Sequence, residues 1–246
     1  MLENIKAIFF DMDGTIIDSM WMWRNIDIEF LGNRGIELPE NLQRDIEGMS
    51  FTETAVFFKN RFNLNESIDD IKHIWNDMAM DKYRHHVPLK LGVAQFLKNA
   101  HERGITMGIA TSNSKELAMC CLDALDITGY FDAVVTGCDV GAGKPSPDVY
   151  LKCARLCNVS PETCMVFEDI PVGIDAGHNA GMKVCAVYDK YSEDIDEIKA
   201  YKDIARVMGD SLVRLKYKPE DMVLKKYSID SNRCIIRNGK GICVSD

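Results

Sequence analysis

The chain has 246 residues, of which 46% are hydrophobic and 27% charged, an ordinary composition for a soluble globular protein with one large domain or a core plus a smaller unit. The net charge of −9 disfavours general binding to nucleic acid, which depends on runs of lysine and arginine that this sequence lacks. No apolar stretch approaches the ~18 residues of a membrane span, so we expect no membrane partner.

The N-terminal residues and the cysteines favour a cytoplasmic protein. The segment MLENIKAIFF has no basic leader or small-residue cleavage site and runs directly into an apolar stretch. The nine cysteines include no C-x-x-C pair and are expected to be reduced thiols that pack as small apolar residues. Reduced thiols are typical of a reducing compartment.

The first predicted element is a short buried strand, Ile5 to Phe10, which ends at Asp11, Asp13 and the turn Gly14-Thr15. In an open parallel sheet, ligands bind in the crevice beyond the carboxyl ends of the strands. We therefore expect both carboxylates at the mouth of such a crevice.

After this strand the pattern becomes helical. Asp18 and Ser19 are plausible N-caps, and apolar residues recur at helical spacing over residues 20–31. Further helices are expected around residues 41–49, 52–62 and 67–85, with little that resembles a strand. Residues 18–87 are thus predicted to form a compact, all-helical insert.

From about Gly92, helices and short apolar runs alternate. Helices are predicted over residues 92–103, 114–125, 146–157 and 171–180, and strands over residues 105–110, 133–136, 164–167 and 184–187. This alternation predicts an α/β fold with a parallel sheet covered on both faces. A glycine-rich turn is expected at residues 137–143, and a final short unit is expected to run to about Leu215.

The C-terminal segment, residues 216–246, does not continue this alternation. Asn238-Gly239 lies between two apolar-containing runs within residues 233–244, which is a strong signal for a β-hairpin with a type I′ turn. We predict a small β-appendage here.

Polar clusters follow the first four predicted strands of the core. They are Asp11 with Asp13, Thr111 with Ser112, Lys144, and Glu168 with Asp169. Any one of them is unremarkable in a surface turn, but four at the carboxyl ends of successive strands converge on one crevice.

Such a cluster of carboxylates needs a cation, because unit charges 4 Å apart repel by about 4 kcal/mol at an effective dielectric constant of 20. Oxygen ligands with room for water and phosphate oxygens suit Mg²⁺. The metal and Lys144 could hold a phosphoryl group, with the Thr111 hydroxyl and backbone N–H groups around it. Asp11 and Asp13 fit the roles of nucleophile and proton shuttle.

These segments closely resemble the signature motifs of the haloacid dehalogenase-like superfamily, in the order typical of that family. DMDGT at Asp11–Thr15 is similar to its first motif and ATSNS at Ala110–Ser114 to its second. GAGKPSPDVY at Gly141–Tyr150 resembles the third motif, and FEDIPVGIDAGHNAGM at Phe167–Met182 resembles the fourth. The resemblance covers about the first 215 residues, with the helical insert where the phosphatase and β-phosphoglucomutase branch places its cap.

The resemblance implies a Rossmann-like catalytic core, residues 1–17 and 88–215, with a helical cap at residues 18–87. It implies that Asp11 is the nucleophile and Asp13 the general acid/base, and that both bind Mg²⁺, Asp13 through its backbone carbonyl. Asp169, with Glu168, would complete the metal site, and Lys144 would bridge Asp11 and the phosphate. Thr111, Ser112 and the N–H of Met12 would bind phosphate oxygens.

Several activities within this family can be weighed. Asp13 argues against dehalogenation, because dehalogenases lack this second aspartate, and no clear cap lysine is present for phosphonatase chemistry. β-Phosphoglucomutases share the whole core but typically carry an arginine directly after Gly-x-Ser in the cap. Here Gly48-Met49-Ser50 is followed by Phe51, which favours hydrolysis over mutase chemistry. A non-catalytic phosphate-binding module would not need a proton shuttle at Asp13.

The expected function is therefore a Mg²⁺-dependent phosphatase that hydrolyses a small phosphomonoester through an aspartyl-phosphate on Asp11; a β-phosphoglucomutase-like transferase is the alternative. Met20, Met49 and Phe51 are the candidate specificity residues, whereas Trp21, Trp23 and Phe30 are expected to pack within the cap. We expect a small phosphorylated metabolite as the partner and a monomer or weak homodimer.

Overall fold

The computed structural model describes residues 4–187, 189 and 191, together with the backbone of four C-terminal strands. Its central element is a sheet with the strand order β3-β2-β1-β4-β5-β8-β9-β6-β7. The first five strands are β1 (Ala7–Phe10), β2 (Thr106–Thr111), β3 (Ala133–Thr136), β4 (Cys164–Glu168) and β5 (Lys183–Val187). All the pairings among these five are parallel. The prediction of a parallel α/β sheet is confirmed.

Strand β1 lies in the middle of the parallel part, between β2 and β4. Its four residues are all buried, because side chains that alternate along a central strand meet helices on both faces. Ile8 and Phe10 belong to one apolar core and Ala7 and Phe9 to another. The residues after β1 therefore emerge at the centre of the molecule.

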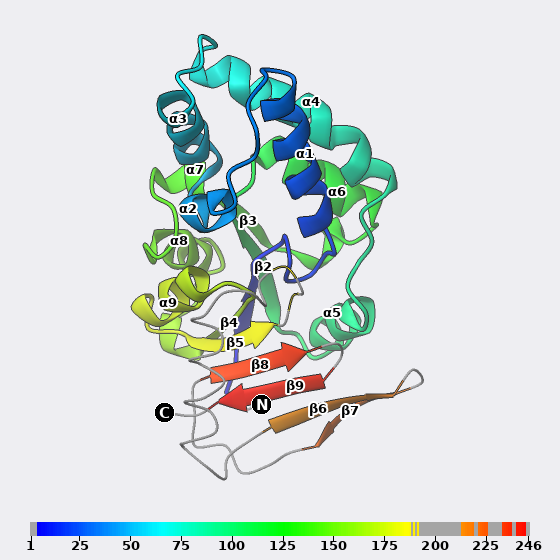
Figure 1. The fold of residues 1–246 in the computed structure, drawn as a ribbon. Helices are drawn as coiled ribbons and strands as arrows, with labels where there is room; N and C mark the ends of the chain where they lie inside the picture. Colours follow the sequence, from blue (N-terminus) through cyan, green and yellow to red (C-terminus); the bar gives the residue numbers. More distant parts are fainter. Residues whose placement is uncertain are drawn as a thin grey trace.

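Four of the five helices between β1 and β2 form an insert that precedes α5 (Val93–Glu102). They are α1 (Met20–Gly32), α2 (Leu42–Ile46), α3 (Phe51–Arg61) and α4 (Ile68–His85). Ser50 and Ser67 begin α3 and α4 with complete capping boxes, which satisfy backbone N–H groups at both helix starts. We call residues 20–85 the helical insert; Figure 1 shows it over one end of the sheet.

The remaining helices cover the two faces of the sheet. They are α5 (Val93–Glu102), α6 (Lys115–Ala124), α7 (Gly137–Val140), α8 (Asp148–Leu156) and α9 (Pro171–Asn179). Two short 3₁₀ turns, Thr128–Tyr130 and Pro161–Thr163, precede β3 and β4. Buried residues of α5 and α6 join the core of Ile8 and Phe10, whereas those of α8 and α9 join the core of Ala7 and Phe9.

Two local predictions differ from the structure. The glycine-rich segment 137–143, expected as a turn, begins with helix α7, because the Thr136 side chain and Asp139 form a capping box there. The helix expected at residues 41–49 ends at Ile46, and Gly48 has a φ of +77°, which an L-residue in a helix does not adopt.

The C-terminal strands are β6 (Val213–Lys218), β7 (Asp221–Lys225), β8 (Arg233–Arg237) and β9 (Lys240–Val244). Strand β8 pairs antiparallel with β9, with Arg237 opposite Lys240, as expected for the predicted hairpin. The same strand pairs parallel with β5, so these strands continue the core sheet. The predicted turn at Asn238-Gly239 and most of the predicted unit before Leu215 lie outside the described residues.

The two connections between the sheet and the helical insert run side by side. Ile17 and Leu89 form an antiparallel β-bridge, the Asp18 N–H donates to the Pro88 carbonyl at 3.0 Å, and the Lys90 N–H donates to the Ile16 carbonyl at 2.9 Å. Among the described helices, none combines the length and apolar character needed to cross a membrane.

Candidate active site

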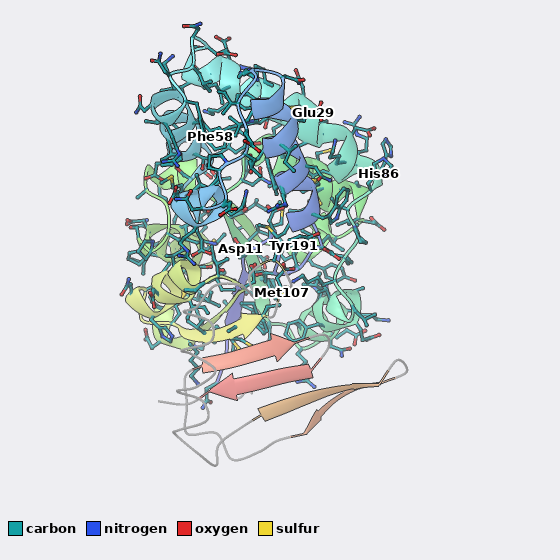
Figure 2. The ribbon with its side chains drawn as sticks, in the orientation of Figure 1. Asp11, Glu29, Phe58, His86, Met107 and Tyr191 are labelled. Atoms are coloured by element: carbon teal, nitrogen blue, oxygen red, sulfur yellow. The ribbon has the colours of Figure 1, made fainter. Side chains whose placement is uncertain are left out.

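The ends of β1, β2 and β4 bring Asp11, Thr111 and Glu168 to the same edge of the sheet. The parallel register places Phe10 beside Ile109 and Phe167, and the Asp11 N–H extends this ladder by donating to the Phe167 carbonyl at 2.9 Å. In Figure 2, Asp11 lies where the strands meet the helical insert. The predicted convergence of the polar clusters at one edge is thus present in the structure.

Lys144 is the buried cation of this site. Its Nζ donates to Asp11 Oδ1 at 2.6 Å and to Glu168 Oε1, and the side chain is 6% exposed. Burial alone would lower the pKa of Lys144, but the two carboxylates outweigh that effect and raise the pKa above its ordinary value. Lys144 therefore remains charged and holds Asp11 in a fixed orientation.

Glu168 is held on both of its oxygens. Oε1 accepts a hydrogen bond from the Tyr150 hydroxyl at 2.9 Å besides the one from Lys144, and Oε2 accepts from the backbone N–H groups of Asp169 and Ile170 at 3.0 and 3.4 Å. Burial and the nearby Glu168 raise the pKa of Tyr150, so this hydroxyl keeps its proton and remains a donor. Glu168 thus fixes the position of Lys144.

Asp11, Glu168 and Asp169 form a buried acidic cluster whose carboxylate oxygens lie within 4.8 Å of one another. Burial raises the pKa of Asp169 to about 7, and the neighbouring Glu168 adds to this shift. The pKa of Asp11 is also raised, first by burial, although Lys144 opposes the change. Three hard oxygen donors, of which Asp11 and Asp169 have raised pKa values, fit a divalent cation such as Mg²⁺.

Gly14 makes the close approach of Asp169 to the first loop possible. Its φ is +82°, and a Cβ atom at this position would lie 2.2 Å from Asp169 Oδ2. The next residue, Thr15, donates its hydroxyl to Asp169 Oδ1 at 2.7 Å. Only glycine satisfies both the conformation and the space, which accounts for the Gly-Thr pair after the two aspartates.

Asp13 accepts hydrogen bonds from side chains that do not belong to the acidic cluster. Its Oδ1 accepts hydrogen bonds from Ser19 Oγ at 2.6 Å, from the Tyr83 hydroxyl and, at 3.4 Å, from Trp23 Nε1. Its Oδ2 accepts from Asn113 Nδ2 at 3.1 Å. Burial and the nearby Asp13 raise the pKa of Tyr83, so its hydroxyl is a donor at neutral pH. Asp13 is thereby tied to α1, to α4 and to the loop after β2.

The predicted phosphate-binding groups lie around Asp11. Thr111 is 1% exposed, and its Oγ1 accepts a hydrogen bond from the Asn113 N–H at 3.1 Å, which leaves the hydroxyl proton to donate. The Met12 side chain is fully buried in the apolar core, so only its backbone can serve the site. Within the described residues, neither the Met12 N–H nor the Asp13 N–H donates a hydrogen bond.

The loop before α3 connects the insert to this edge of the sheet. The Phe51 N–H donates to the Ser112 carbonyl and the Lys144 N–H donates to the Gly48 carbonyl, both at 2.8 Å. A Cβ on Gly48 would lie 2.7 Å from the Lys144 carbonyl oxygen, so glycine is required at this contact. The segment Gly48–Phe51 thus lies directly against the loops after β2 and β3.

A cavity of about 540 Å³ lies between the insert and the sheet. Residues from the sheet side line it, namely Asp11, Asp13, Thr111, Ser112 and Asp169, and so do the predicted specificity residues Met20, Met49 and Phe51. The ring of Trp23 packs against Phe51 and Tyr83 within the insert, as expected, and Trp23 also lines the cavity. Phe30 is buried in the core, as expected.

Several residues of this site were not predicted from the sequence. Tyr83, Asn113 and Tyr150 hold Asp13 or Glu168, and Asp27 and Gln43 line the insert side of the cavity. Asn113 and Tyr150 lie within the segments ATSNS and GAGKPSPDVY and could have been found there. Tyr83 and Asp27 occupy ordinary positions in helical patterns, and no local signal distinguishes them.

Comparison with known proteins agrees with this geometry. The haloacid dehalogenase-like hydrolase family matches residues 8–187 of the chain. Fructose-1-phosphate phosphatase YqaB of Escherichia coli (strain K12) is 33% identical over 192 residues, which cover 74% of this chain and 96% of that protein.

Two solved structures have similar folds. CbbY from Rhodobacter sphaeroides, in complex with phosphate, has a TM-score of 0.71 at 24% identity and covers 78% of this chain and 89% of its own. A putative β-phosphoglucomutase from Thermotoga maritima has a TM-score of 0.60 at 27% identity, with 80% and 91% covered. The site geometry and the match over residues 8–187 agree, and the chain belongs to the haloacid dehalogenase-like hydrolase family.

Proposed function

We propose that this protein is a Mg²⁺-dependent phosphatase that hydrolyses a small phosphomonoester through an aspartyl-phosphate on Asp11. The observation that carries the proposal is the buried contact of Lys144 with Asp11, beside Asp169 and open to a cavity. The similar protein from E. coli is named a fructose-1-phosphate phosphatase, which supports a phosphorylated metabolite as the substrate.

In the first half of the reaction, a carboxylate oxygen of Asp11 attacks phosphorus and the bond from phosphorus to the leaving oxygen breaks. Asp13 gives its proton to that oxygen, which departs as an alcohol. Lys144 holds the attacking carboxylate, and Thr111, Ser112 and backbone N–H groups of the first loop bind the phosphoryl oxygens.

In the second half, Asp13 takes a proton from a water molecule, which attacks the aspartyl-phosphate. The bond between phosphorus and Asp11 breaks, phosphate is released, and the Asp11 carboxylate and the proton on Asp13 are restored. A Mg²⁺ ion bound by Asp11, Asp169 and the Asp13 carbonyl, with Glu168 close by, would supply positive charge to the phosphoryl oxygens.

The helical insert would act as a cap over this site, with residues 18–87 as a unit distinct from the core of residues 1–17 and 88–215. Its loop Gly48–Phe51 and its helix α1 line the cavity, so groups of the insert meet the part of the substrate that leaves. Met20, Met49 and Phe51 would then select among leaving groups.

A β-phosphoglucomutase-like transferase is the second candidate, because Arg24 and Arg44 line the same cavity and could bind a second phosphate. Phe51, by contrast, is 5% exposed and packs against Trp23 and Trp75, so the position after Ser50 offers no charge. Activity on glucose 1-phosphate that appears only with a bisphosphate activator would identify the transferase.

The phosphatase proposal is tested by phosphate release from a panel of several dozen phosphomonoesters. We expect the Asp11→Asn variant to lose more than about a thousandfold in turnover, because the nucleophile is removed. EDTA should stop the wild-type reaction and added Mg²⁺ should restore it. Appreciable turnover by the Asp11→Asn variant would exclude Asp11 as the nucleophile, and indifference to EDTA would exclude the metal.

A further inference from the structure

One face of helix α1 lines the cavity, and the most C-terminal residue of α1 in the cavity wall is Asp27. Met20, Trp23, Arg24 and Asp27 follow the spacing i, i+3, i+4, i+7 and all line the cavity, whereas Met22, Ile26 and Phe30 point into the apolar core. Asp27 is only 6% exposed, although it belongs to the cavity wall. A carboxylate is therefore held away from bulk water at a surface where substrate binds.

Gln43 of helix α2 is the hydrogen-bond partner of this carboxylate. Its Nε2 donates to Asp27 Oδ2 at 2.6 Å. In the part of the chain that the structure describes, Asp27 forms no ion pair, and its Oδ1 has no hydrogen-bond partner. Burial raises the pKa of Asp27 to about 7, and the Gln43 hydrogen bond offsets only part of that effect.

A buried carboxylate without a cation is costly, because transfer of a charge out of water is compensated only by pairing or hydrogen bonds. Nothing in the packing of α1 requires a charged group at this position, since the core-facing residues of the helix are all apolar. The free oxygen of Asp27 is therefore suited to a group that arrives with the ligand.

The position of Asp27 along α1 indicates which part of the ligand it meets. Trp23 Nε1 donates to Asp13, the proposed acid/base, and Asp27 lies one helical turn further, about 6 Å along the axis. A leaving group that extends from Asp13 along this face of α1 would therefore bring its distal end towards Asp27, on the same cavity wall.

The charges around Asp27 favour a neutral partner over an ionic one. Among the charged residues of the helical insert that line the cavity, Arg24 and Arg44 match Glu40 and Glu47 in number, which leaves no unmatched arginine of the insert for Asp27. A hydroxyl can donate to the carboxylate and accept from the carboxylic acid, so it binds Asp27 in either form. An ammonium group binds only the carboxylate.

We propose that Asp27, positioned by Gln43, is a subsite for a distal hydroxyl of the leaving group, so that long polyhydroxylated phosphomonoesters are preferred over alkyl phosphates of the same length. This subsite rests on the proposed phosphatase function and deepens it. It is separate from the residues that bind the phosphoryl group.

The test compares hexitol 6-phosphate, n-hexyl phosphate and p-nitrophenyl phosphate as substrates of the wild type and of Asp27→Asn. We expect Asp27→Asn to lower kcat/KM for the hexitol phosphate about 5- to 10-fold, because a hydrogen bond to a charged group is replaced by a weaker one to a neutral amide. The other two substrates should be nearly unaffected. Glu40→Gln removes an exposed carboxylate from the same cavity and serves as the matched control.

Two further measurements test whether the effect of Asp27→Asn arises from binding of the distal hydroxyl and not from a change in the catalytic step. Gln43→Met should reproduce part of the selective loss, since it removes only the group that orients Asp27. Calorimetry can compare the affinities of the hexitol and hexyl phosphates for the Asp11→Asn variant and for the Asp11→Asn, Asp27→Asn double variant. Because neither protein turns the ligand over, this comparison reports binding alone.

If no phosphomonoester of the panel, the hexitol phosphate included, is hydrolysed, the proposed phosphatase function fails, and the binding comparison alone decides on the subsite. Equal effects of Asp27→Asn on hexitol and hexyl phosphates, or no effect on either, would overturn the subsite. A selective effect on 6-aminohexyl phosphate but not on the hexitol phosphate would also overturn it, in favour of an ammonium group.

Discussion

Asp13 receives hydrogen bonds from three separate segments of the chain: Ser19 and Trp23 near the start of α1, Tyr83 near the end of α4, and Asn113 after β2. Tyr83 is central to this arrangement, because its oxygen also accepts from Trp23 Nε1 at 2.9 Å and from Asn113 Nδ2 at 2.6 Å. In its proposed role as proton shuttle, Asp13 must point at the leaving oxygen, so the groups that orient it should affect proton transfer selectively.

We expect Tyr83→Phe to lower kcat for alkyl phosphates about tenfold and to affect p-nitrophenyl phosphate much less, because a nitrophenolate departs without a proton. Steady-state rates with the two substrate types measure the difference. Tyr150→Phe is the matched control, since that hydroxyl holds Glu168 and its loss should affect both substrates alike. An equal loss on both substrates in Tyr83→Phe would show that Tyr83 serves structure alone.

At the scale of elements, the loop Gly48–Phe51 matters as much as any helix, because its backbone contacts join the insert to the loops that hold Ser112 and Lys144. The contact depends on close approach of two backbones, which a side chain at residue 48 would prevent. Displacement of this loop would shift Lys144 relative to Asp11.

Gly48→Ala should therefore lower the free energy of unfolding by about 2–4 kcal/mol and reduce kcat/KM as well. Gly35→Ala is the matched control, because Gly35 also has a positive φ, +70°, but no atom lies within 4 Å of its Cβ position. That variant should lose about 1 kcal/mol from backbone strain alone and keep its activity. Urea unfolding measures the free energy of unfolding, and steady-state rates measure kcat/KM. Equal losses of stability in the two variants would show that contact between the new Cβ and the Lys144 carbonyl oxygen does not matter.

The sequence predicts most of this architecture because each strand is a short apolar run that ends at a polar turn, and parallel strands direct those turns to one edge. Asp11, Thr111, Lys144 and Asp169 could be found in this way. Tyr83 could not, because it continues the apolar stripe of Ile71, Trp75 and Ala79 on α4. Its contact with Asp13 spans 70 residues and depends on how the insert packs.

At the scale of the whole molecule, Asp27 makes the free energy of unfolding fall as pH rises, because its pKa is raised in the folded protein. Its pKa in the folded protein, about 7, exceeds the value of about 3.9 in an unfolded chain. Between these values the folded state binds more protons than the unfolded state, so the stability contributed by this group falls as pH rises from about 4 to about 7. Asp27 therefore destabilises the protein at neutral and higher pH.

Asp27→Asn should raise the free energy of unfolding by about 1–3 kcal/mol at pH 8 and by clearly less at pH 5, since the difference in pKa sets a ceiling of about 4 kcal/mol. Urea unfolding at the two pH values measures this. Glu40→Gln should show no such dependence, because Glu40 is exposed. An equal gain in the free energy of unfolding at pH 5 and pH 8 would contradict the raised pKa of Asp27. Stability gained together with lost selectivity is expected where a group is retained for function.

The antiparallel pairing of Ile17 with Leu89 places the start and the end of the helical insert next to each other. A segment whose two ends are adjacent can be lengthened, shortened or exchanged without altering the register of β1 and β2. Because Asp11, Thr111, Lys144 and Asp169 all lie outside the insert, evolution can change the insert while the proposed phosphoryl-transfer site stays the same. Grafting the insert of another family member at residues 17 and 89 is therefore a direct route to new specificity.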